Sequence, residues 1–180
     1  MKTLKLIIVF VLILTGLVFI PAKSQNYDFT IDSIVKKYNP NRKDYVILID
    51  YNMGIFSKRL FVIDLKTKQR VISSKVSHAF NSGMLYPTSL SNTTGTNKTC
   101  VGVFETENTK FGRFGYSMVI NGLDHGINDN AKQRAIIFHS NKLMKTSWSN
   151  GCFATDADTN KKIIDLTNNG CLVIVLKNNQ

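Results

Sequence analysis

Several chemical features are scarce or missing in this 180-residue chain, and each absence narrows the range of functions. Only 12 acidic residues stand against 23 lysines and arginines. There is no cysteine spacing typical of a zinc site, no glycine-rich loop that would hold a phosphate, and no internal repeat. We therefore expect a protein without a metal and without a cofactor.

The excess of positive charge favours anionic surroundings, such as nucleic acid, acidic lipid headgroups or bacterial wall polymer. The basic residues do not cluster, however, and occur as isolated doublets at Lys36-Lys37, Lys58-Arg59 and Lys161-Lys162. No basic segment alternates with aromatic residues as it does in proteins that bind single strands. We expect no nucleic-acid partner and interpret the charge mainly as a solvated surface.

A long hydrophobic run occurs only at the N-terminus. A basic start precedes the apolar stretch Leu6–Ile20, Pro21 ends it, and Ala22-Lys23-Ser24 supplies small residues for cleavage. The pattern predicts a signal peptide at residues 1–24; an uncleaved membrane anchor is the alternative, although the run is short for a bilayer span. Cleavage would leave 20 basic and 12 acidic residues in a secreted or periplasmic protein without stable membrane insertion.

Short β-type runs dominate the remaining chain, and two segments have helical spacing. The predicted strands cover residues 45–50, 59–65, 70–76, 99–105, 115–120, 135–139 and 172–176. A helix is predicted over 26–38, and a second from Asp156 or Asp158 to about residue 166. This pattern indicates a mainly β domain with flanking helices (α+β), built as a sandwich or a mixed sheet, at 42–180. An N-terminal helix and linker at 25–41 would precede it.

Three cysteines are an odd number for an exported protein, so at least one thiol is free unless it pairs between chains. Cys100 and Cys171 each open an apolar run, so they are either buried or paired with each other. Cys152 differs, because it follows Asn150-Gly151 outside any periodic segment. A free thiol in an oxidising compartment is best explained by a chemical role.

The most informative stretch of the chain is Ile137–Thr155, which contains Phe-His-Ser and then, after a short loop, Ser-Asn-Gly-Cys. His139 ends an apolar run, and an imidazole near its ordinary pKa can accept a thiol proton and stabilise the thiolate. A pair of His139 and Cys152 would therefore form an activated nucleophile. The structural alternatives are a strand-end histidine bonded to a carbonyl and a buried, inert cysteine.

The order of these motifs resembles the murein L,D-transpeptidases of the YkuD-like class. The similarity covers residues 45–176 and includes Val76–Gly83, Val101–Thr106, Gly115–Met118 and Gly126–Ala131. It implies the fold of an L,D-transpeptidase catalytic domain and an enzyme that acts on the stem peptides of peptidoglycan.

The resemblance also implies roles for individual residues. Cys152 would be the nucleophile and His139 its base, oriented by the backbone carbonyl of Ser140. Gly151 and the peptide N–H groups around Cys152 would form an oxyanion hole.

The implied reaction begins with attack on a tetrapeptide stem, release of D-alanine and formation of a thioester. An amine would then make a 3→3 cross-link, water would make the enzyme an L,D-carboxypeptidase, and a lipoprotein lysine would attach protein to the wall. A non-catalytic wall-binding module is the alternative from another class. The sequence indicates no oligomeric state.

Five further residues are candidates for binding the stem peptide. Trp148 and Tyr116 offer aromatic surface with a polar tip, with loop anchoring and core packing as their respective alternatives. Ser149 would brace the nucleophile loop, and His78 would either flank the cleft or bond to a loop. Asn150 stands where the wider class has histidine and the similar branch tryptophan, and an asparagine cannot act as a proton shuttle.

Two arginines, Arg113 and Arg134, are candidates for pairing with a carboxylate of the stem peptide. An ordinary surface position is the alternative for both residues.

Overall fold

The computed structural model describes residues 27–141 and 148–178. The predicted signal peptide at residues 1–24 lies outside these ranges. Within them, none of the helices combines the length and the apolar character needed to cross a membrane.

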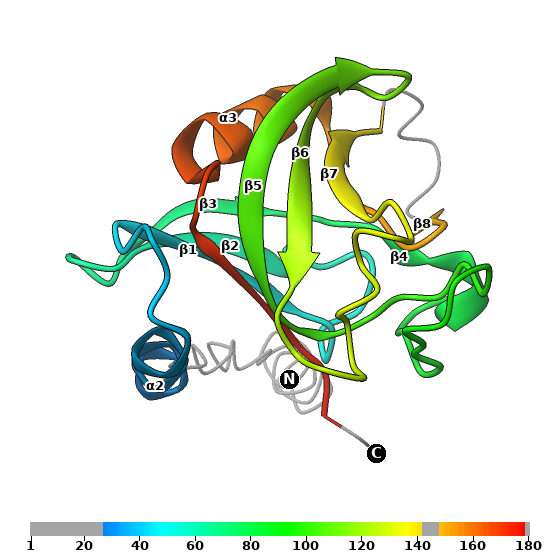
Figure 1. Cartoon of the computed structure of the whole chain (residues 1–180), viewed down its shortest axis with the longest axis horizontal. Coiled ribbons are helices and arrows are strands. Elements are labelled where there is room, and N and C mark those ends of the chain that lie inside the picture. Colours follow the sequence, from blue (N-terminus) through cyan, green and yellow to red (C-terminus); the bar gives the residue numbers. More distant parts are fainter. Residues whose placement is uncertain (1–26, 142–147, 179–180) are drawn as a thin grey trace, which may run out of the picture.

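The described chain is mainly β, with two α-helices and one short 3-10 helix (Figure 1). In order, the elements are α2 (Asp28–Tyr38), β1 (Tyr45–Asp50), β2 (Leu60–Asp64), β3 (Arg70–Ser74), β4 (His78–Ala79), η1 (Phe80–Ser82), β5 (Gly102–Gly112), β6 (Gly115–Gly122), β7 (Ile137–Ser140), β8 (Trp148–Ser149), β9 (Phe153–Thr155), α3 (Ala157–Thr167) and β10 (Leu172–Leu176).

One large mixed sheet has the strand order β3-β2-β1-β10-β5-β6-β7-β9. The pairs β1–β10 and β7–β9 are parallel, and the other neighbouring pairs are antiparallel. A separate two-stranded sheet pairs β4 with β8 in parallel. The predicted mainly β domain with flanking helices is therefore confirmed, in the form of a mixed sheet.

The two faces of the large sheet carry two separate apolar clusters. Side chains alternate along β1, so that Ile47 and Ile49 belong to one cluster and Val46 and Leu48 to the other. Helix α3 contributes Ile163 and Ile164 to the first cluster, whereas α2 packs against the second. The helices thus cover opposite faces (Figure 1), which explains why β1 is apolar from Tyr45 to Ile49.

Capping residues determine where α3 begins and where α2 ends. The Asp156 side chain accepts a hydrogen bond from Thr159 N at 2.9 Å, which caps the start of α3 as predicted. Helix α2 ends at Tyr38, and the next residue, Asn39, caps it with φ +45° before Pro40.

Strand β5 extends seven residues past the predicted end at Glu105 and reaches Gly112. Its outer half is mostly polar, and even its apolar residue Phe111 is exposed, so burial patterning does not reveal this part of the strand. Pairing with β6 extends the strand, and the register shifts between Thr106 and Thr109.

Candidate active site

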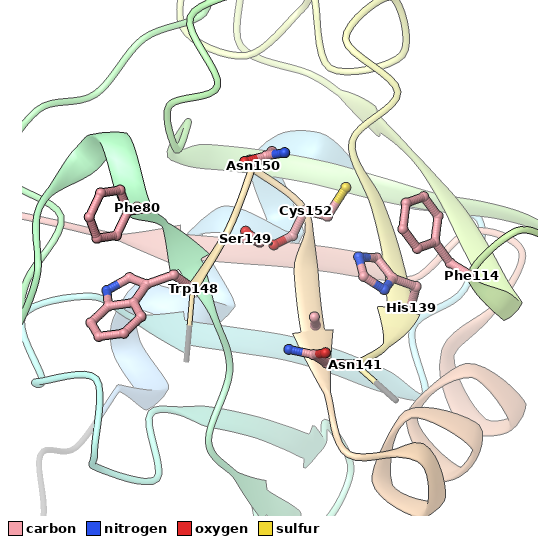
Figure 2. Close-up of a pocket in the computed structure, with 9 residues that line it drawn as sticks. Phe80, Phe114, His139, Asn141, Trp148, Ser149, Asn150 and Cys152 are labelled. Atoms are coloured by element: carbon pink, nitrogen blue, oxygen red, sulfur yellow. Dashed lines mark hydrogen bonds between the residues drawn. The ribbon is translucent and has the colours of Figure 1, made fainter. Parts of the chain in front are cut away.

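A cavity of about 520 Å³ lies beside strands β7 and β9, at one edge of the large sheet. Its size suits a peptide-sized ligand. The lining residues are Phe80, Phe114, His139, Asn141, Trp148, Ser149, Asn150, Cys152 and Ala154. Figure 2 shows Phe80 and Trp148 on one side, Phe114 beside His139 on the other, and the Cys152 thiol between them.

His139 lies on β7 and is only 8% exposed. Its Nδ1 lies 3.0 Å from the carbonyl oxygen of Ser140. Because a carbonyl can only accept, Nδ1 carries the proton and Nε2 is left as the basic nitrogen. Burial lowers the pKa of His139, and the bond to Ser140 opposes this shift. The imidazole is therefore neutral at physiological pH and able to accept a proton.

Phe114 lies over the His139 ring, with a centroid separation of 4.5 Å and an interplanar angle of 31°. Phe114 itself is 45% exposed, so it shields the imidazole from solvent while forming the outer wall of the cavity.

Cys152 comes directly before β9, whose Phe153 and Ala154 pair with Phe138 and His139 of β7. Continued by one residue, this register places Cys152 opposite Ile137, two positions before His139 on β7. In Figure 2 the sulfur is directed toward the side of the cavity where His139 lies. Its Sγ lies 3.6 Å from the carbonyl oxygen of Ala135.

Burial raises the pKa of the Cys152 thiol, and the backbone N–H of Ile137 and the positive charges of Arg134 and Lys110 oppose this shift. Since the pKa of His139 moves down and that of Cys152 moves up, the resting pair is a neutral thiol and a neutral imidazole. Proton transfer would accompany attack on a substrate.

Two serine hydroxyls hold the backbone of the nucleophile loop. The Cys152 carbonyl oxygen accepts from Ser149 Oγ at 2.8 Å and from Ser77 Oγ at 3.1 Å. Ser77 Oγ also accepts from Ala154 N at 3.0 Å, and Ser149 Oγ accepts from Gly151 N at 3.1 Å. The Gly151 N–H is thus occupied, whereas the Cys152 N–H has no partner among the described residues.

Gly151 is required by the geometry of this loop. Its φ of +118° is unfavourable for other residues, and an added Cβ would lie 2.8 Å from Ile136 Cδ1 and 3.2 Å from Lys98 O. A glycine therefore lets the chain turn directly before the nucleophile.

The structure does not bring every candidate residue into the cavity. His78 is fully buried, with Nδ1 2.8 Å from Arg59 Nη2 and Nε2 2.8 Å from Gly83 O. Tyr116 donates to Asp165 at 3.2 Å and stacks on Phe111, away from the lining residues. Because its Nε2 bonds to Gly83 O, His78 supports the segment Phe80–Gly83, whose first residue lines the cavity.

Trp148 and Asn150 do line the cavity, together with Phe80, which the sequence analysis did not single out. Trp148 donates from Nε1 to Met84 O at 2.9 Å and meets Phe80 edge to face at 5.8 Å. These contacts, together with the β4–β8 pairing, join the nucleophile loop to the segment after β4.

Five residues of the site were missed by sequence reasoning: Phe80, Phe114, Asn141, Ala154 and the bracing Ser77. The only available signal was Phe114, an aromatic in a glycine-flanked turn where a large apolar side chain has no core to enter. The positions of the other four depend on tertiary contacts.

The structure also shows the positions of the other two cysteines and of Arg134. All three cysteines are free, and Cys100 and Cys171 are buried, so they do not form a disulfide. Arg134 donates to the backbone oxygens of Ser91, at 2.7 Å, and of Lys98. Within residues 27–141 and 148–178, no three histidine, cysteine or acidic side chains gather in a way that could hold a metal.

A comparison with protein families identifies the family of this chain. The family model described as the L,D-transpeptidase catalytic domain matches residues 22–176. No curated protein sequence matches the chain.

Solved structures of low sequence identity are similar to this chain, and one of them has a TM-score above 0.5. The helical cell shape determining protein of Campylobacter jejuni is 13% identical with a TM-score of 0.55, over 78% of this chain and 49% of that one. An L,D-transpeptidase from Mycobacterium smegmatis is 12% identical with a TM-score of 0.48, over 74% and 59%. One from Mycobacterium tuberculosis is 13% identical with a TM-score of 0.48, over 77% and 58%.

The chain thus spans between about half and three fifths of the length of these solved structures. The family model, by contrast, covers residues 22–176 of this chain, which include His139 on β7 and Cys152 directly before β9. The chain belongs to the L,D-transpeptidase catalytic domain family.

Proposed function

We propose that the protein is a cysteine acyltransferase of the bacterial cell envelope that forms a thioester with a peptidoglycan tetrapeptide stem. One observation carries this proposal: the Cys152 thiol and the His139 imidazole line one cavity, with Cys152 directly before β9 and His139 on the paired strand β7. Family membership supports peptidoglycan as the substrate.

In the first step His139 Nε2 accepts the thiol proton while Cys152 Sγ attacks the carbonyl carbon of the third, diamino-acid residue. The Cys152 N–H donates to the oxyanion that forms. When the intermediate collapses, the bond to the terminal D-alanine breaks, and His139 returns the proton to the leaving amine. A thioester and free D-alanine result.

The second step depends on the acceptor. An amine from a neighbouring stem attacks the thioester and yields a 3→3 cross-link with a regenerated thiol. Water gives a shortened stem instead, and a lipoprotein lysine gives attachment of protein to the wall. All three acceptors use the same acyl-enzyme, and we propose the stem amine.

The test is turnover of a purified disaccharide tetrapeptide, followed by mass spectrometry of the products. We expect wild-type protein to release D-alanine and form a cross-linked dimer, while Cys152→Ala and His139→Ala form neither. The variant Cys171→Ala serves as the matched control, because it removes a thiol far from the cavity lining.

Two other outcomes are informative. Release of D-alanine with a tripeptide as the only second product would assign the carboxypeptidase reaction. No release, combined with equal retention of wild type and Cys152→Ala on purified murein, would contradict the enzyme and indicate a non-catalytic wall-binding module.

A further inference from the structure

The β5–β6 hairpin brings two positive charges to the side of the cavity where His139 lies. Lys110 pairs with Ser117 on β6, and Ser117 pairs with His139 on β7. Side chains at laterally paired positions leave the same face of a sheet. Lys110 therefore points to the face that carries His139, about 10 Å away across two strand spacings.

Arg113 occupies the tip of the same hairpin. Its guanidinium lies 5.8 Å from the centroid of Phe114, whose ring covers His139 at 4.5 Å. Lys110 also acts electrostatically on the Cys152 thiol and favours its charged form. Lys110 therefore lies on the face of the sheet that carries His139, and Arg113 lies beside Phe114. Phe114 itself stands across the cavity from Phe80 and Trp148 (Figure 2).

Neither cation is neutralised by a carboxylate of the described chain. Lys110 and Arg113 take part in no salt bridge among the described residues, although acidic groups lie on neighbouring parts of the hairpin and of α3. Glu107 pairs with Lys132 at 2.7 Å, and Asp165 pairs with Lys161 on the opposite face. The cavity lining itself contains no carboxylate.

The direction of the leaving group follows from the proposed chemistry. His139 must reach the leaving nitrogen to protonate it, so the departing residue lies on the His139 side of the reacting carbon. The carboxylate of a terminal amino acid is separated from that nitrogen by a single carbon. A departing D-alanine would therefore direct its carboxylate past Phe114 toward the hairpin.

We propose that Lys110 and Arg113 form a subsite for the free carboxylate of the leaving residue, and so select stems that end directly after the scissile bond. This inference rests on the proposed acyl transfer and adds which stem peptides the enzyme would select. A lysine and an arginine together suit this role, since both pair with carboxylates and the arginine can do so through two parallel hydrogen bonds.

The experiment compares a tetrapeptide stem that ends in D-alanine with the same peptide carrying a C-terminal amide. Release of D-alanine or D-alaninamide is measured by mass spectrometry, and kcat/KM is obtained for each. We expect wild type to prefer the free acid by about tenfold, since each exposed charge pair contributes a few-fold. The preference should decline as sodium chloride is raised, because exposed charges are screened.

In the double variant Lys110→Gln/Arg113→Gln, turnover of the free acid should fall about tenfold to the level of the amide. The control variant Lys36→Gln/Lys66→Gln removes the same charge from α2 and from the β2–β3 turn, and should keep the wild-type preference. A merely structural role of the hairpin would lower turnover of both substrates together.

The outcomes separate the two proposals. Turnover of both substrates at similar rates by wild type, or an unchanged preference in the double variant, would overturn the carboxylate subsite while the acyl transfer stands. No turnover of either substrate by wild type would overturn the acyl transfer and the subsite with it.

Discussion

Lowering the pH should destabilise the protein through His78, the buried histidine behind the cavity wall. Its imidazole accepts from Arg59 at 2.8 Å and donates to Gly83 O at 2.8 Å, so the ring is neutral with the proton on Nε2. Burial, assisted by the nearby positive charge of Arg59, lowers the pKa of His78 to about 4, although the bond to Gly83 opposes this shift.

The sign of the effect follows from proton binding. An unfolded chain binds the proton at the ordinary histidine pKa of 6.5, whereas the folded protein binds it only near a pKa of about 4. The contribution of His78 is therefore complete above pH 6.5 and is lost as the pH falls toward 4. Between pH 7 and pH 5 this linkage removes about 2 kcal/mol from the free energy of unfolding.

The assay is urea denaturation of wild type and His78→Gln at several pH values from 7 to 5. Glutamine can still donate to Gly83 O but has no group that titrates in this range. The difference between the two proteins isolates His78 from His139, whose lowered pKa acts in the same direction in both. Equal pH dependence of the two proteins, or an NMR titration of His78 with a midpoint near 6.5, would refute the reasoning.

Three further predictions concern the nucleophile loop. Gly151→Ala should destabilise the protein by about 1–3 kcal/mol and abolish turnover, because φ is +118° and the new Cβ would meet Ile136 at 2.8 Å; thermal unfolding and D-alanine release check this. Ser77→Ala should cost about 1–3 kcal/mol in denaturant unfolding, since it leaves the buried Ala154 N–H unpaired, while Ser77→Thr should retain most stability. Alkylation of Cys152 by iodoacetamide should accelerate steadily above neutral pH, because burial raises the thiol pKa; a plateau between about pH 5 and 8 would instead indicate a preformed thiolate–imidazolium pair.

The parts of the fold that burial patterning determines were predictable. Strands β1 and β10 match their predicted bounds, because burial on both faces demands long apolar runs, Tyr45–Ile49 in β1 and Leu172–Leu176 in β10. The outer half of β5 was not predictable, since its residues are exposed and only pairing with β6 orders them. Strands β4 and β8 contain two residues each, too few for any periodicity to appear.

The candidate site likewise has residues that the sequence predicts and residues that it does not. His139 and Cys152 could be found because both lie in one stretch with a recognisable motif. Phe80 and Phe114 could not be placed at the cavity, since each is far from that stretch in the chain and reaches it only through the folded sheet. The burial of His78 depends on Arg59, a residue 19 positions earlier whose own burial the sequence does not indicate.

Acylation of Cys152, with His139 as its base, can be tested by peptide mapping after treatment with a carbapenem. We expect a single adduct on the peptide that contains Cys152, none on those containing Cys100 or Cys171, and much slower labelling of His139→Ala. Wild-type protein that stays unmodified, or an adduct carried by another residue, would contradict the account.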